Sequence, residues 1–256
     1  MKSSLVLIGS VNNGNNNTLG TGILISFNFK EYLVTCKHII FEEKFERLFA
    51  IPNPRMTKSL SYEHKILSIG SVNYHPEDTD NETFDIAVCE IINLKRTEFQ
   101  RCHLSFIQVH EMMEFKDPEN EDDIIWYGYP VDYTEKLLAL NKNDRLPPFT
   151  TSATVFNFPI QQLPQNGFIT KLKEGYFAQN ENKQDSWKGI SGGLVTIENN
   201  HCTKPYGVIL GSTKFTCYHD SQKENYNGIV FAKFKRVKEV LQTLKRKKHP
   251  TKKNKT

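Results

Sequence analysis

The chain has 256 residues, of which 38% are hydrophobic and 24% charged, so it can bury a sizeable core and lacks the composition of a disordered protein. Its formal net charge of +4 arises at the C-terminal end, where residues 245–256 hold seven Lys or Arg and no acid. No apolar run approaches the roughly 20 residues that cross a bilayer, so we expect no membrane span.

Short β-type runs, rich in Val, Ile, Phe and Tyr, follow one another from the start of the chain. The first five are SLVLIGSV, GTGILISF, YLVTCKHII, HKILSIGSVNYH and DIAVCEII. The next six are DIIWYGYPV, TTSATVFNF, NGFITKL, SGGLVTIE, YGVILGST and NGIVFAKF. Turn signals such as NNGNNN and IPNP separate them, and no strand–helix alternation appears. This pattern predicts an antiparallel all-β protein, a sandwich or a barrel.

The end of the chain differs, because apolar residues recur there at helical spacing: Val237, Val240, Leu241 and Leu244. We therefore expect an amphipathic helix at 233–248, followed by a basic, disordered tail at 249–256. A polar, acidic segment at 111–122 is the expected connection between an N-terminal unit, 1–110, and a C-terminal unit, 123–232.

Three side chains in these runs together suggest acyl-transfer chemistry. His38 stands at the end of the expected strand YLVTCKHII, Asp85 at the start of an apolar strand, and Ser191 lies in GISGG. Each also has an ordinary structural interpretation, as a surface histidine, a turn aspartate and a glycine-rich turn. Histidine can take the proton of an attacking serine, and a buried carboxylate orients the imidazole. We therefore predict Ser191 as nucleophile, His38 as general base and acid, and Asp85 as the residue that orients His38.

The glycines around Ser191 also have a predicted role. The backbone N–H groups of Gly189 and Ser191 are the expected donors to the oxyanion that forms during attack. Gly192 and Gly193 permit a tight turn and a close approach of the backbone.

The segments GTGILIS…YLVTCKHII, FDIAV and GISGGLV…YGVILGS, in this order, resemble the chymotrypsin-like (trypsin-like) serine peptidases. The resemblance covers nearly the whole chain. It implies two antiparallel six-stranded β-barrels with a C-terminal helix, and an active site in the cleft between the barrels. His38 and Asp85 would belong to the first barrel and Ser191 to the second. It also implies a peptide or protein substrate and no cofactor or metal.

The chain departs from the secreted digestive members of that family. Ile190 replaces the aspartate that pairs with a newly formed amine in those enzymes, so this mode of activation is not available. The chain has five cysteines with no regular spacing, and none is adjacent to Ser191. It is more similar to bacterial and intracellular trypsin-like peptidases, and we expect a cytoplasmic protein whose activity a regulatory partner controls.

The resemblance also suggests which residues bind substrate. Asp185 stands at the position of the acid in the primary pocket of trypsin, which implies a preference for Arg or Lys at P1. The alternative is that the loop takes another path and leaves Asp185 on the surface. The strand that contains Leu210, Gly211 and Ser212 is expected to form a pocket wall and to pair with the substrate backbone.

Other interpretations remain open at this point. The two units could form a catalytically silent module that binds a protein partner in its cleft. The tail Lys245–Thr256 could contact nucleic acid or another acidic surface. HC at 201–202 and CYH at 217–219 could meet across a hairpin as a zinc site or a disulfide, or could be unconnected hairpin ends.

Overall fold

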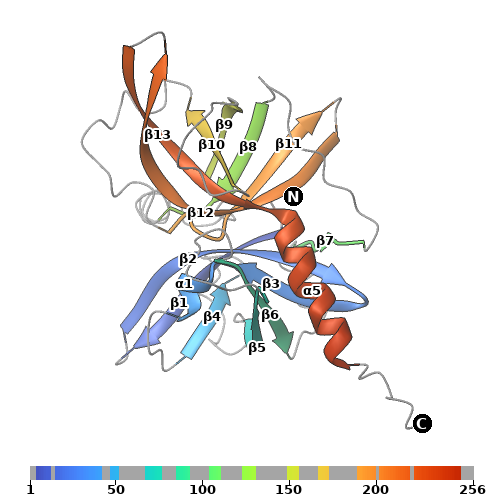
Figure 1. Cartoon of the computed structure of the whole chain (residues 1–256). Coiled ribbons are helices and arrows are strands. Elements are labelled where there is room, and N and C mark those ends of the chain that lie inside the picture. Colours follow the sequence, from blue (N-terminus) through green and yellow to red (C-terminus); the bar gives the residue numbers. More distant parts are fainter. Residues whose placement is uncertain are drawn as a thin grey trace.

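The structure is a computed structural model, in which twelve segments are described. They are 4–12, 15–41, 47–51, 67–76, 85–92, 104–110, 123–130, 149–155, 167–172, 189–199, 202–219 and 222–248. The described residues form two groups of β-strands, a short helix and a C-terminal helix, which Figure 1 shows with the two groups stacked on each other. Neither described helix combines the length and the apolar character that crossing a membrane requires.

The first group contains seven strands from the N-terminal part of the chain. They are β1 (Leu5–Asn12), β2 (Asn15–Phe27), β3 (Lys30–Thr35), β4 (Arg47–Ile51), β5 (Leu67–Tyr74), β6 (Ala87–Ile92) and β7 (Ile107–Gln108). Their order is β1-β4-β5-β6-β3-β2-β7, and β1 also pairs with β2. Six strands are therefore paired in a ring, and β7 joins β2 in parallel.

The second group contains six strands, all paired antiparallel. They are β8 (Asp123–Gly128), β9 (Phe149–Val155), β10 (Gly167–Leu172), β11 (Leu194–Asn199), β12 (Cys202–His219) and β13 (Gln222–Lys233). They close in the order β10-β13-β12-β11-β8-β9. The hairpin of β12 and β13 extends beyond the other strands of this group (Figure 1).

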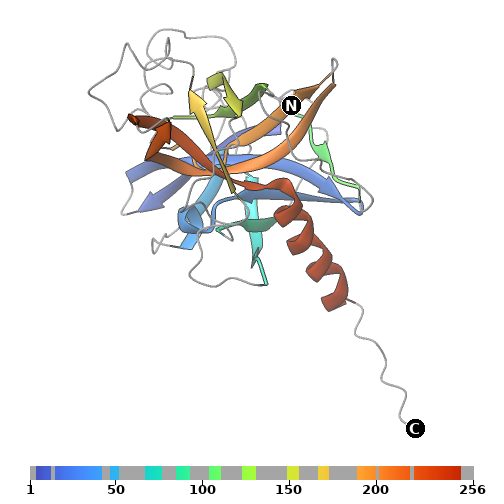
Figure 2. The same cartoon turned by 45° about the horizontal axis from the view of Figure 1, so that its top comes forward.

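The core follows from the alternation of apolar residues along the strands, which points one face of each strand inward. Fully buried side chains lie on strands of both groups, for example Leu5, Ile23, Leu33, Val88, Leu194 and Val208. Helix α5 (Phe234–Lys248) continues directly from β13 (Figure 2). It buries one apolar stripe, Phe234, Val237, Val240 and Leu241, and contacts strands of both groups.

An ion pair fixes α5 to the first group. Glu239 of α5 accepts a hydrogen bond from Nε2 of the buried His75, which directly follows β5, at 2.7 Å. Arg236 donates to the same carboxylate, also at 2.7 Å. Burial alone would raise the pKa of Glu239, but the hydrogen bonds and positive charges of His75 and Arg236 lower it overall.

The prediction of an antiparallel, mostly β protein with a C-terminal helix is confirmed. One local prediction is wrong. The run that contains His38 does not remain a strand, because β3 ends at Thr35 and Lys37–Phe41 forms helix α1. Of the two interpretations of Cys202 and Cys217, the structure agrees with the one that leaves them unconnected, because they lie near opposite ends of the single strand β12. The expected connection at 111–122 and the tail at 249–256 lie outside the described residues.

Candidate active site

The pairing of β3 with β6 brings His38 and Asp85 together. Thr35 and Ala87 are paired where β3 ends and β6 begins, so α1, which starts at Lys37, lies beside Asp85, two residues before β6. The Asp85 carboxylate accepts from the backbone N–H of His38 at 2.9 Å and from its Nδ1 at 2.5 Å. The backbone N–H of Lys37 donates to the Asp85 carbonyl at 3.3 Å. These bonds fix the imidazole in position and in tautomer, with the proton on Nδ1.

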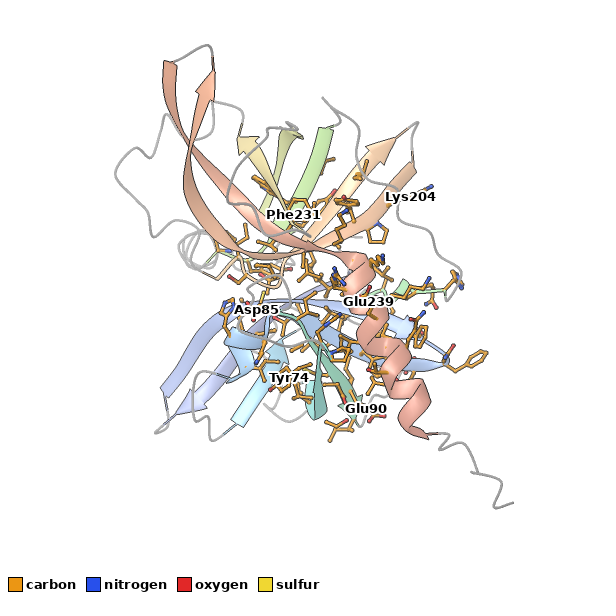
Figure 3. The ribbon with its side chains drawn as sticks, viewed as in Figure 1. Tyr74, Asp85, Glu90, Lys204, Phe231 and Glu239 are labelled. Atoms are coloured by element: carbon orange, nitrogen blue, oxygen red, sulfur yellow. The ribbon has the colours of Figure 1, made fainter. Side chains whose placement is uncertain are left out.

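Both side chains are only partly covered. The exposed fraction is 35% for the His38 side chain and 20% for that of Asp85. Figure 3 shows Asp85 at the level where the two groups of strands meet. The pair is therefore sheltered enough to be ordered and open enough to meet another molecule.

The second part of the site is the turn at 189–193, directly before β11. Gly193 N–H donates to the Ile190 carbonyl at 2.9 Å and closes the turn, and Gly192 N–H donates to the Ile209 carbonyl of β12 at 2.7 Å. Ile190 is buried, and its side chain lies so close to Gly128 that a Cβ there would be 2.8 Å from Cγ1. The turn is thus held on both sides by the second group of strands.

Gly192 is required by its surroundings. Its φ is +82°, and a Cβ at this position would lie 1.9 Å from the Thr21 carbonyl oxygen and 2.4 Å from Thr35 Oγ1. Thr35 is the last residue of β3, and His38 lies three residues later. The close approach at Gly192 therefore brings the Ser191 turn against the segment that leads into His38.

Thr21 of β2 connects the turn to the first group of strands. Its backbone N–H donates to the Ser191 carbonyl at 2.9 Å, and its hydroxyl donates to the Gly189 carbonyl at 3.0 Å. The hydroxyl also accepts from Tyr129 N–H at 2.8 Å, and Thr35 Oγ1 donates to the Thr21 carbonyl at 2.8 Å. Thr21 and Thr35 are fully buried.

Ser191 Oγ donates a hydrogen bond to the Leu210 carbonyl at 3.0 Å and not to His38. Leu210 lies at a register irregularity of β12, between Ile209 and Gly211. No atom of the residues that the structure describes lies within 4 Å of a Cβ built at Gly211, so among these residues this stretch of β12 borders open space beside Ser191. The backbone of Ser212 pairs with Ile229, and Asp185 lies outside the described residues.

A fully buried thiol, that of Cys36, lies close to the His38–Asp85 pair. Cys36 Sγ donates to the Ile209 carbonyl at 3.0 Å, and burial, followed by the charge of Asp85, raises its pKa. Donor atoms of Cys36, His38 and Asp85 lie within 4.8 Å of one another, so they form a group that could hold a metal ion. All three are engaged in the hydrogen bonds described above, and we assign no metal to them.

The structure thus brings together several predicted site residues from distant parts of the chain. His38 and Asp85 are in direct contact, and Ser191 and Gly189 share one turn beside Leu210 and Gly211. Sequence reasoning missed the roles of Thr21 and Thr35 in fixing this turn. A signal for Thr21 was present, because it stands between Gly20 and Gly22 in a strand, and glycine within a strand often marks a close backbone approach.

Comparisons with known proteins agree with this architecture. The sequence matches no protein-family model and no curated protein. A thermostable serine protease, AL20, from an extremophilic microorganism superposes with a TM-score of 0.56 at 13% identity, over 94% of this chain and 97% of that one. The protease Anisep from Arthrobacter nicotinovorans superposes with a TM-score of 0.52 at 15% identity, over 94% and 93% of the two chains. At these identities the likeness concerns the fold, and the chain has the fold of these proteases.

Proposed function

We propose that the protein is a serine endopeptidase that cleaves peptide bonds through a Ser191–His38–Asp85 triad. The observation that carries the proposal is the paired contact of His38 with Asp85, at 2.9 Å and 2.5 Å. This geometry holds an imidazole with its proton on Nδ1, which makes Nε2 the basic nitrogen. The serine protease fold of the chain adds independent support.

The reaction would proceed in two stages, acylation of Ser191 and hydrolysis of the acyl-enzyme. Ser191 Oγ attacks the scissile carbonyl carbon while His38 Nε2 takes the hydroxyl proton. The tetrahedral intermediate collapses, the C–N bond breaks, and His38 gives the proton to the leaving amine. Water then attacks the acyl ester, His38 takes its proton, and Ser191 regains its hydrogen as the carboxylic acid leaves.

Ser191 must turn before it reacts, because its hydroxyl donates to the Leu210 carbonyl in the free protein. Rotation about χ1 moves a serine hydroxyl between staggered positions at small cost. Catalytic hydrogen bonds in free enzymes are often formed only when substrate binds. The Leu210 contact is thus compatible with a resting position of the nucleophile.

Substrate would lie along the open stretch of β12. Leu210 and Gly211 border the Ser191 hydroxyl, and the absence of atoms around a Cβ at Gly211 leaves room for a peptide backbone. We propose that Leu210, Gly211 and Ser212 bind this backbone by strand addition. We further propose that Asp185 selects Arg or Lys at P1 by a charge-assisted hydrogen bond.

The second candidate function is a catalytically silent module that binds a protein partner in the same place. The Ser191–Leu210 hydrogen bond favours it, since a serine held in this way has no base at its hydroxyl. The ordered His38–Asp85 pair favours the enzyme, because a module that only binds needs no oriented imidazole.

Cleavage of a peptide library separates the two candidates. We expect the wild-type protein to cleave peptides and Ser191→Ala to cleave none. Binding of peptides without cleavage by either protein would support the silent module. Asp185→Ala should abolish a preference for Arg or Lys at P1; an unchanged preference would remove Asp185 from the substrate site.

A further inference from the structure

We propose that Thr21 is a positioning residue that holds the Ser191 turn in the shape needed to bind an oxyanion. The inference rests on the proposed peptidase function and identifies what prepares its oxyanion site. Thr21 lies on β2 in the first group of strands, whereas the turn precedes β11 in the second. One half of the protein therefore sets the backbone of the reactive turn in the other half.

Three successive carbonyl groups of the turn are engaged inside the protein. Thr21 takes two of them, the Gly189 carbonyl through its hydroxyl and the Ser191 carbonyl through its N–H. The Ile190 carbonyl between them accepts from Gly193 N–H. Every peptide from Gly189 to Gly192 is thus fixed by a hydrogen bond on its oxygen.

These bonds determine which groups the turn offers to a substrate. In a trans peptide the C=O and N–H point in opposite directions, and the chain has no cis bond among the described residues. The bond on the Ile190 carbonyl therefore directs Ser191 N–H away from Gly193. The two peptides that Thr21 holds, Gly189–Ile190 and Ser191–Gly192, flank this one, so they set the direction of Ser191 N–H, one of the two expected oxyanion donors.

The hydroxyl of Thr21 acts inside a fully buried site. It accepts from Tyr129 N–H as well as donating to Gly189, so one oxygen links β2, the end of β8 and the turn. Loss of the hydroxyl leaves two buried backbone groups, the Gly189 carbonyl and the Tyr129 N–H, without this partner. Without this bond the Gly189–Ile190 peptide, which lies between the expected donors Gly189 N–H and Ser191 N–H, is free to turn.

A further anchor of the turn is apolar. Ile190 is buried against Gly128 and carries no charge. The turn is therefore held by neutral hydrogen bonds, from Thr21 and to the Ile209 carbonyl, and by burial of Ile190. This arrangement prepares the oxyanion site without an ion pair at the residue before the nucleophile.

Three variants test the role of Thr21. Thr21→Val keeps the shape of the side chain and removes the hydroxyl, and Thr21→Ser restores it. Thr196→Val is the matched control, because Thr196 is equally buried and its hydroxyl donates to the Ile125 carbonyl at 3.1 Å, away from the turn. All three are compared with wild type by peptide hydrolysis, by inhibition with a peptide boronic acid, and by amide hydrogen exchange at residues 189–195.

We expect Thr21→Val to lower kcat by about 10- to 100-fold, approaching the loss of one oxyanion donor, with KM changed less than about threefold. Binding of the boronic acid, whose tetrahedral adduct places an oxygen at the oxyanion site, should weaken in parallel. Exchange of the Gly192 and Gly193 amides should become faster. Thr21→Ser should recover most of the activity, and Thr196→Val should leave kcat and exchange near the wild-type values.

Several results would overturn the role of Thr21. The first is that Thr21→Val has the kcat, the boronic acid affinity and the amide exchange rates of wild type. The second is that Thr196→Val loses as much activity and amide protection as Thr21→Val. If wild type shows no hydrolysis at all, the proposed function fails, but the exchange measurement still decides about Thr21. Faster exchange confined to the turn in Thr21→Val would support the positioning role, and unchanged exchange would refute it.

Discussion

The Asp85 carboxylate holds His38 at two points, accepting from its backbone N–H at 2.9 Å and from its Nδ1 at 2.5 Å. The first bond fixes the start of helix α1, and the second fixes the ring. A carboxylate that binds both the backbone and the ring of one residue orients the imidazole relative to the chain. The two halves of this contact can be separated by mutation.

Asp85→Asn should separate the role of the Asp85 carboxylate in the fold from its role in orienting His38. The amide oxygen can still accept from His38 N–H, so the fold should survive. The ring loses its carboxylate acceptor and adopts the wrong tautomer, and kcat should fall by about 10⁴-fold. Peptide hydrolysis and near-UV circular dichroism check both expectations. A folded Asp85→Asn protein that keeps more than about a tenth of wild-type kcat would contradict an orienting role for Asp85.

Gly192→Ala is expected to destabilise the protein severely. The added methyl group would meet the Thr21 carbonyl oxygen at 1.9 Å, at a φ of +82°. We expect a loss of more than about 2 kcal/mol in the free energy of unfolding, measured in urea. Gly211→Ala is the matched control, since no atom in the described part of the chain lies within 4 Å of its Cβ, and its unfolding free energy should change by less than about 0.5 kcal/mol. Equal stability of the two variants would show that the close approach at Gly192 is misjudged.

The contact of α5 with His75 predicts a pH-dependent contribution to stability. The pKa of Glu239 is lowered in the folded protein by His75 and Arg236, despite the opposing effect of burial. Its stabilisation is therefore present above the ordinary pKa of the group, near 4.5, and disappears as the pH falls through the lower folded-state pKa. Glu239→Gln should lower the urea midpoint of unfolding at pH 7. The difference in midpoint between Glu239→Gln and wild type should become smaller as the pH falls. An effect of the substitution that is the same at pH 7 and in strong acid would argue against this ion pair.

The two described free cysteines should be unreactive in the folded protein. Burial raises the pKa of Cys89 to about 12, and burial and the charge of Asp85 raise the pKa of Cys36 well above its usual value. Almost no thiolate is then present at pH 8. Iodoacetamide treatment followed by mass spectrometry should find both unmodified in the native protein and modified in urea. Rapid modification of Cys36 in the folded protein would contradict this prediction, because it would show that the reagent reaches this thiol.

The sequence predicted the parts of this structure that depend on local pattern. Strand runs with period-two alternation and the apolar stripe of α5 follow from side-chain periodicity. The order of His38, Asp85 and Ser191 suggested a triad before any geometry was known. The helix at Lys37–Phe41 was missed because its apolar residues Ile39 and Ile40 also fit a strand.

Contacts between the two groups of strands could not be predicted. Thr21 reaches Gly189 across 168 residues of sequence, and no local pattern encodes that distance. The predicted run YGVILGST covers only the central part of β12, which extends over Cys202–His219. Local sequence patterns thus yield the elements, and long-range packing decides which side chains meet.

Covalent labelling with a fluorophosphonate tests whether His38 activates Ser191, because only a serine activated by a base displaces the fluoride at a useful rate. Wild type, Ser191→Ala and His38→Ala are incubated with the probe, and the modified residue is located by mass spectrometry. We predict labelling of wild type at Ser191 alone and none in either variant. A folded wild-type protein that stays unlabelled, or labelling at another residue that persists in Ser191→Ala, would contradict it.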